Sequence, residues 1–199
     1  MEIPTGVSHS SFLILHSSFK KSHCVHRVIG GFHPNINQKP KTMTNKDQEF
    51  MQMAIEASVE NVKNGGGPFG AVIVRNDEVV AVGVNRVTAN NDPTAHAEVS
   101  AIRAACQKLN TFHLNDCVIY TSCEPCPMCL SAIYWSGITK IYYGNNAQDA
   151  EAIGFGDKFI YDEIKRPMSE RSIPSINYMR SEALSAFRAW EEKEDKIEY

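Results

Sequence analysis

Two short segments about thirty residues apart constrain this chain more than any other feature of its sequence. The first is His96-Ala97-Glu98, and the second is Pro125-Cys126-Pro127-Met128-Cys129. One imidazole and two thiolates together suit zinc, a borderline-soft ion. We therefore expect a fold that brings both segments to a single place, each at the start of a helix.

The spacing within each segment indicates a catalytic zinc. Cys126 and Cys129 lie one helical turn apart, so their sulfur atoms can bind the same ion, and a helix N-terminus favours the thiolate form. With His96 there are three protein ligands, which leaves the fourth tetrahedral position for a water that zinc acidifies. Glu98 is turned away from ligation and is predicted to transfer protons. H-x-E followed by P-C-x-x-C is the signature of the zinc deaminases.

A structural zinc site is the alternative interpretation. Cys123 would then be the fourth ligand, and the chain would be a non-catalytic zinc module in which the ion only joins two helices. Pro125 favours an extended backbone just before it, so the Cys123 side chain need not share the face of the following helix. A structural site would also leave the acid Glu98 beside the metal without a role.

Apolar periodicity and turn residues predict alternating helices and strands. Thr44 or Asn45 caps the first helix, and the run from Asn64 to Gly67 ends it. We expect a three-layer α/β/α sandwich with its sheet covered on both faces. The predicted helices are 45–63, 92–109, 124–135, 148–153 and 181–192, and the predicted strands are 69–75, 79–84, 117–121 and 138–143.

The first 42 residues differ from the rest of the chain. They carry five Lys or Arg and one acid, so residues 43–199 hold 15 basic and 22 acidic side chains, a net charge of −7. Residues 1–42 are expected to be a disordered extension, as a transit segment or because translation starts at Met43. The deaminase domain is then 43–199. Its negative charge argues against a nucleic-acid partner.

Cysteine spacing and hydropathy bear on the compartment. The three-residue intervals in Cys123, Cys126 and Cys129 favour metal binding over disulfides, which indicates a reducing, cytoplasmic location. No apolar run reaches the length of a membrane-spanning helix, so no membrane association is expected.

Around these motifs the sequence resembles the bacterial-type guanine deaminases of the cytidine-deaminase superfamily. The resemblance covers about residues 46–199 and includes GGPFGAVIV, NDPTAHAEV, YTSCEPCPMC, AIYW, FIYDEI and the terminal EY. It implies a cytidine-deaminase-like fold with a five-stranded mixed sheet, and one Zn²⁺ per subunit at two helix N-termini. It also implies a homodimer whose C-terminal segments are exchanged between subunits.

The resemblance also implies roles for individual residues. His96, Cys126 and Cys129 would bind the zinc and Glu98 would shuttle protons, while Asn85 would hydrogen-bond the purine. Phe69 and Trp135 would form walls of the pocket, for which plain core packing is the alternative. Asp149 would contact guanine, for which helix capping is the alternative. Tyr199 of a neighbouring subunit would close the site as a lid.

The reaction implied is guanine plus water giving xanthine plus ammonia, in purine catabolism or salvage. His at the first ligand position argues against the free-cytidine deaminases, which resemble C-A-E there. A tRNA adenosine deaminase shares both motifs, but its anticodon substrate requires a basic surface with stacking aromatic side chains. A guanosine deaminase would need an open ribose pocket, which a closing Tyr199 would obstruct.

Overall fold

The structure, a computed structural model, describes residues 43–198. The predictions made for residues 1–42 and for Tyr199 lie outside that range. Within it, none of the helices combines the length and the apolar character needed to cross a lipid bilayer. The helices are α1 (Asn45–Lys63), α2 (Val87–Asn90), α3 (Ala97–Leu109), α4 (Pro127–Ser136), α5 (Ala147–Ala152), α6 (Lys158–Lys165), the 3-10 turn η2 (Met168–Glu170) and α7 (Arg180–Glu192).

The sheet is mixed and has the strand order β2-β1-β3-β4 among the described residues. β1 pairs antiparallel with both β2 and β3, whereas β3 and β4 run parallel. The four predicted strands are therefore all present, with their ends shifted by at most two residues. The strands are β1 (Gly70–Arg75), β2 (Glu78–Val84), β3 (Cys117–Cys123) and β4 (Lys140–Asn145).

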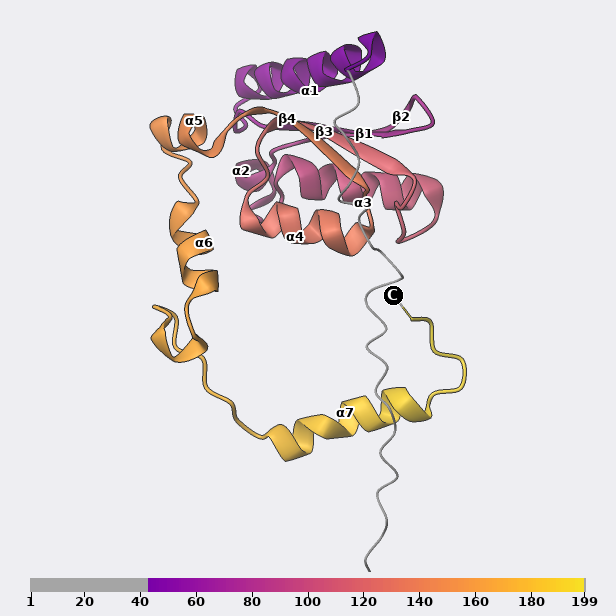
Figure 1. The fold of residues 1–199 in the computed structure, drawn as a ribbon, viewed down its shortest axis with the longest axis vertical. Coiled ribbons are helices and arrows are strands. Elements are labelled where there is room, and N and C mark those ends of the chain that lie inside the picture. Colours follow the sequence, from indigo (N-terminus) through magenta and orange to yellow (C-terminus); the bar gives the residue numbers. More distant parts are fainter. Residues whose placement is uncertain (1–42, 199) are drawn as a thin grey trace, which may run out of the picture. The chain divides into compact units, whose positions relative to one another are not determined.

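Helices cover both faces of this sheet, as predicted. Figure 1 shows α1 on one face and α3 and α4 on the other. The side chains of β1 alternate between the two faces: Val72 and Val74 pack with Phe50 of α1, while Ala71 and Ile73 join the core under α3. Burial on both faces explains why β1 reads as an unbroken apolar run.

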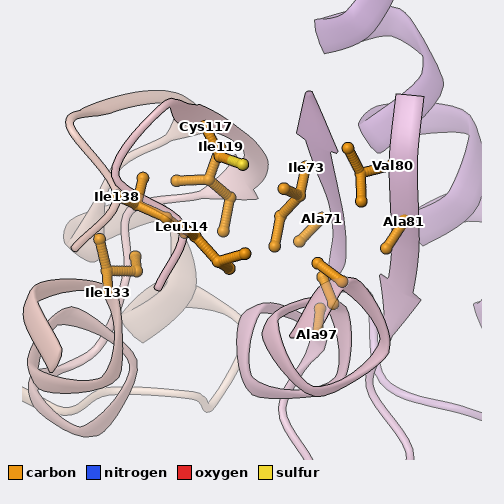
Figure 2. Packing of buried hydrophobic residues seen from close by; sticks show 12 residues of the cluster. Ala71, Ile73, Val80, Ala81, Ala97, Leu114, Cys117, Ile119, Ile133 and Ile138 are labelled. Carbon is orange, nitrogen blue, oxygen red and sulfur yellow. The ribbon is translucent and has the colours of Figure 1, made fainter. Parts of the chain in front are cut away.

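The larger core lies between the sheet and the helices α3 and α4. Ile73, Ile119, Leu114 and Ile133 meet there (Figure 2), and each is at most 2% exposed. α3 can lie close to β2 because Gly83 has no side chain. A Cβ at that position would come within 2.3 Å of the Ala97 carbonyl oxygen. This tight packing fixes the N-terminal end of α3 against the sheet.

The two helices that carry the motifs begin later than predicted. α3 begins at Ala97, whereas the sequence predicted a start near Asp92. The carboxylate of Asp92 instead accepts hydrogen bonds from the backbone N–H and the hydroxyl of Thr94, at 2.8 and 2.7 Å. Such an Asx turn competes with helix formation. α4 likewise begins at Pro127, three residues after the predicted start.

After β4 the structure departs from the implied five-stranded sheet. The sheet of the described residues has four strands, and β4 is one of its edges. The chain continues instead into α5, into α6, which was not predicted, and into α7. No residue of α6 or α7 is buried. The predictions of helices near 148–153 and 181–192 are confirmed, and a capping box begins the first of them, α5.

Candidate active site

His96 and Cys126 occupy the same kind of position, immediately before a helix. His96 is the N-cap of α3 and Cys126 is the N-cap of α4, and both have extended backbones, with ψ of 162° and 168°. Neither side chain accepts a capping hydrogen bond from its helix. Both side chains are thus available to bind a ligand at the helix N-terminus.

The structure brings the three predicted donors together. Nδ1 of His96 lies 3.6 Å from Sγ of Cys126 and 3.5 Å from Sγ of Cys129. A tetrahedral zinc with Zn–N of about 2.0–2.1 Å and Zn–S of about 2.3 Å would hold these atoms roughly 3.6 Å apart. Among the described residues, this trio forms the group of donors able to hold a metal ion. The geometry therefore fits one zinc ion.

The charges of the donor set also call for a cation. The hydrogen bond from the Cys129 thiol lowers the pKa of Cys126, and the same bond raises the pKa of Cys129. The hydrogen bond to Cys126 raises the pKa of His96. Without a metal the two sulfur atoms share a proton, and a bound zinc ion would replace that proton and stabilise both as thiolates.

Cys123 stands apart from this trio. Its sulfur lies 3.8 Å from the Asn146 carbonyl oxygen, and burial raises its pKa to about 11. His96, Cys126 and Cys129 form a group whose ligand atoms all lie within 4.8 Å of one another, and Cys123 is not part of that group. The donor set thus remains at three protein ligands, which is the arrangement of a catalytic zinc site.

Glu98 sits against the zinc donors without joining them. Its carboxylate is 6% exposed and accepts hydrogen bonds from the Thr121 hydroxyl at 3.3 Å and from the Cys129 thiol at 3.4 Å. Burial raises the pKa of Glu98. A carboxylate with a raised pKa is suited to take up and return a proton near neutral pH.

A cavity of about 510 Å³ opens beside these groups. His96, Cys126 and Glu98 line one part of it, and the run from Gly65 to Gly67 lines another. Asn85 also lines the cavity; its Oδ1 accepts a hydrogen bond from the Val87 N–H at 3.3 Å. Phe69 also lines the cavity. Its ring makes a T-shaped contact with the ring of Phe155, with 5.1 Å between the ring centroids. The volume suits a ligand of one or two rings.

The zinc-binding region of the cytidine and deoxycytidylate deaminases matches residues 44–145, about half of the chain. The chain belongs to the cytidine and deoxycytidylate deaminase family. It is a zinc-dependent deaminase, and the group of candidate zinc donors falls in the matched region together with Glu98.

Individual relatives show which members of the family this chain is similar to. A guanine deaminase from Bacillus subtilis is 50% identical over 153 residues, which cover 76% of this chain and 98% of that protein. The crystal structure of a Bacillus subtilis guanine deaminase, at 49% identity, superposes with a TM-score of 0.75 over 79% of this chain and 99% of that one. A tRNA-specific adenosine deaminase from Aquifex aeolicus is 39% identical, over 47% of this chain and 62% of that protein.

Two of the expected substrate contacts of this deaminase lie away from the cavity. The carboxylate of Asp149 accepts the Asn146 N–H at 2.9 Å and so completes a capping box at the start of α5. This was the alternative interpretation for Asp149. Trp135 lies on α4, and its side chain is 60% exposed. Neither residue is among those that line the cavity.

Asp157 is one of the acids that line the cavity and that the sequence analysis missed; Glu124 is another. Asp157 is the N-cap of α6 and lines the cavity together with Glu98 and His96. Partial burial raises the pKa of Asp157 most, and the negative charge of Cys126 raises it further. An acid after a glycine-rich turn was the available signal, but α6 itself was not predicted, so Asp157 had no expected position in the fold.

Proposed function

We propose that this deaminase converts guanine and water into xanthine and ammonia. The observation that carries the proposal is the 50% identity to a guanine deaminase from Bacillus subtilis over 98% of that protein's length. The cavity supports it, because its lining includes His96, Cys126 and Glu98 together with the amide of Asn85. A purine suits this cavity in size and polarity.

When bound, the zinc ion supplies the acidity that prepares a water molecule for attack. Glu98 accepts one proton from that water and delivers it to the ring nitrogen beside C2, and it then accepts the second proton from the same oxygen and delivers it to the departing amine. Its burial favours the protonated form between these two steps. The oxygen of the water bonds to C2, the bond from C2 to the exocyclic amine breaks, and ammonia leaves.

Asn85 and Asp157 are proposed to orient the base. The Oδ1 atom of Asn85 is engaged by Val87, so its Nδ2 group is offered to an acceptor on the purine. The Asp157 carboxylate accepts from a ring N–H of guanine. Phe69, fixed by the edge contact with Phe155, packs against the base. Such a pattern of donor and acceptor places C2 at the zinc.

We further propose that the active site is completed by a second copy of the chain through exchanged C-terminal segments. α6 and α7 leave large apolar side chains exposed: Phe159 at 66%, Ile164 at 56% and Phe187 at 69%. Exposed apolar faces of this kind mark interaction surfaces. Trp135 of α4, 60% exposed, offers a further apolar contact. Tyr199 is then proposed to close the partner's cavity.

Light scattering tests the assembly, and deletion of Tyr199 tests the lid. A dimer that persists when Tyr199 is deleted, together with a raised KM for guanine, is the expected result. A monomer with full activity would overturn both parts of the proposal.

We propose a free base as the substrate and a reducing, cytoplasmic compartment as the location. The net charge of −7 in residues 43–199 disfavours an RNA partner. The cysteines of the described residues are free thiols, and a zinc site with two thiolates is preserved in a reducing medium.

Ammonia release by the zinc-loaded protein tests the proposed reaction. Guanine, guanosine, adenine, cytosine, cytidine and a tRNA anticodon stem-loop are assayed in parallel. Turnover of guanine in preference to the others is expected. Turnover of the stem-loop with guanine inert would assign the chain to tRNA editing, and silence on every substrate with zinc tightly bound would indicate a structural metal.

A further inference from the structure

We infer that Asn61, on the last turn of α1, is a positioning residue that sets the shape of the base-binding wall. This inference rests on the proposed function, because it concerns how the cavity holds guanine. Asn61 touches neither the zinc donors nor Glu98. It acts through Gly67 and Asn85, which both line the cavity.

One amide group of Asn61 joins two separate parts of this wall. Its Nδ2 donates to the carbonyl oxygen of Gly67 at 2.8 Å and to that of Asn85 at 2.9 Å. Asn61 is 9% exposed, so water does not readily replace either bond. Both hydrogens of the amide are used, and each fixes a backbone carbonyl at the cavity.

The backbone of Asn61 holds its side chain at this point. The Gly66 N–H donates to the Asn61 carbonyl at 2.8 Å, and the Gly65 N–H donates to the Val62 carbonyl at 3.0 Å. These two bonds form a Schellman motif, with Gly65 at φ 81° as its left-handed residue. The helix therefore ends where the Asn61 amide meets the outgoing loop.

The glycines of this loop leave room for the amide and for Asn85. A Cβ on Gly66 would come within 2.3 Å of the Asn61 Nδ2 atom, and a Cβ on Gly67 within 3.1 Å of the Asn85 Cγ atom. The loop thus packs directly on the two asparagines. A shift of the Asn61 amide must move Gly67 and Asn85, and with them the group proposed to bind the purine.

This arrangement makes a specific kinetic prediction. The zinc donors and Glu98 lie at the N-terminal ends of α3 and α4, whereas Asn61 contacts Gly67 and Asn85 of the cavity lining. Losing the amide should weaken binding of the base more than it slows the chemical step. We expect Asn61→Asp, which keeps the shape but removes the donor, to raise KM for guanine about tenfold, with kcat changed less than about threefold.

Two further variants separate positioning from stability. Gly66→Ala keeps Asn61 but drives a methyl group against its amide, so it should raise KM in the same direction. Ser58→Ala is the matched control, because Ser58 is also buried on α1 and its hydroxyl donates only within the helix, to the Ile55 carbonyl. Its KM should equal that of the wild type.

The test is steady-state ammonia release with guanine for the full-length wild type and the three variants, with zinc content and Tm measured on each sample. A raised KM in Asn61→Asp and Gly66→Ala, at one zinc per subunit, supports the inference. Unchanged KM values with only a lower Tm would reduce Asn61 to a structural role. Absence of guanine turnover in the wild type would instead overturn the proposed function.

Discussion

The Nδ1 atom of His96 lies 3.5 Å from the Sγ atom of Cys129, although 33 residues of chain separate them. Two different helices present these atoms, each from its N-terminal end. The distance is that expected between two ligands of one tetrahedral zinc ion, roughly 3.6 Å. The two side chains are therefore expected to bind the same zinc ion.

Replacing Cys126 by Ala should reduce the zinc content from one ion per subunit towards zero and abolish turnover. The Tm should fall by several degrees, because metal binding to the folded state contributes to its stability. Metal analysis after dialysis and thermal unfolding measure both effects. Cys123→Ala is the control: it should retain its zinc, and loss of zinc in that variant would restore the four-ligand structural site.

Replacing Glu98 by Gln should lower kcat/KM by about 10²–10⁴ while zinc stays bound. Gln keeps the size of the side chain and can still pair with the Thr121 hydroxyl, but it cannot accept a proton at neutral pH. Steady-state kinetics and zinc analysis of the same preparation check this. Retention of more than about a tenth of the activity would show that another group transfers the proton.

Asp157 and Asp149 form a matched pair of acids eight residues apart. Asp157→Asn should raise KM for guanine or lower kcat by about tenfold or more, because the carboxylate lines the cavity. Asp149→Asn should leave the kinetic constants unchanged and cost about 0.5–2 kcal/mol of stability through the capping box of α5. The reverse pattern in the two variants would return the substrate contact to Asp149.

Asp47 and Tyr120 provide a pH-dependent contribution to stability that involves none of the zinc donors. The Tyr120 hydroxyl donates to the Asp47 carboxylate at 2.5 Å, which lowers the pKa of Asp47 to about 2. Because the folded pKa is below the ordinary value of 3.8, this stabilisation is present above pH 4 and lost as the pH falls towards 2. Tyr120→Phe should therefore lower Tm at pH 7 and lose this effect near pH 2.

Thermal unfolding of the wild type and Tyr120→Phe between pH 7 and pH 2.5 measures the difference. Tyr178→Phe, at a side chain that is 82% exposed, is the control and should match the wild type throughout. A Tm difference that stays constant down to pH 2.5 would contradict the role of Asp47.

The zinc donors and Glu98 were identifiable from sequence because their chemistry is encoded in short spacings. Cys126 and Cys129 are one helical turn apart, and Glu98 follows His96 by two residues, so local geometry decides which groups face the ion. The sandwich was equally predictable, since β1 is apolar at every position that two helical layers bury.

The other cavity residues depended on long-range packing. Asp149 has a local partner, because it completes a capping box with Asn146, whereas nothing local indicates where Asp157 points. One carboxylate turns back to the Asn146 N–H while the other lines the cavity, because the chain after β4 passes into α5 and α6 instead of a fifth strand.

The sequence by itself determined the zinc-deaminase chemistry of this protein and the order of its central helices and strands. The tertiary structure decided which polar groups meet the substrate cavity. Asn61 illustrates the difference: its amide reaches the Asn85 carbonyl across 24 residues of chain, at 2.9 Å. Such a contact arises only when α1, the glycine loop and β2 are packed together, and no spacing along the chain encodes it.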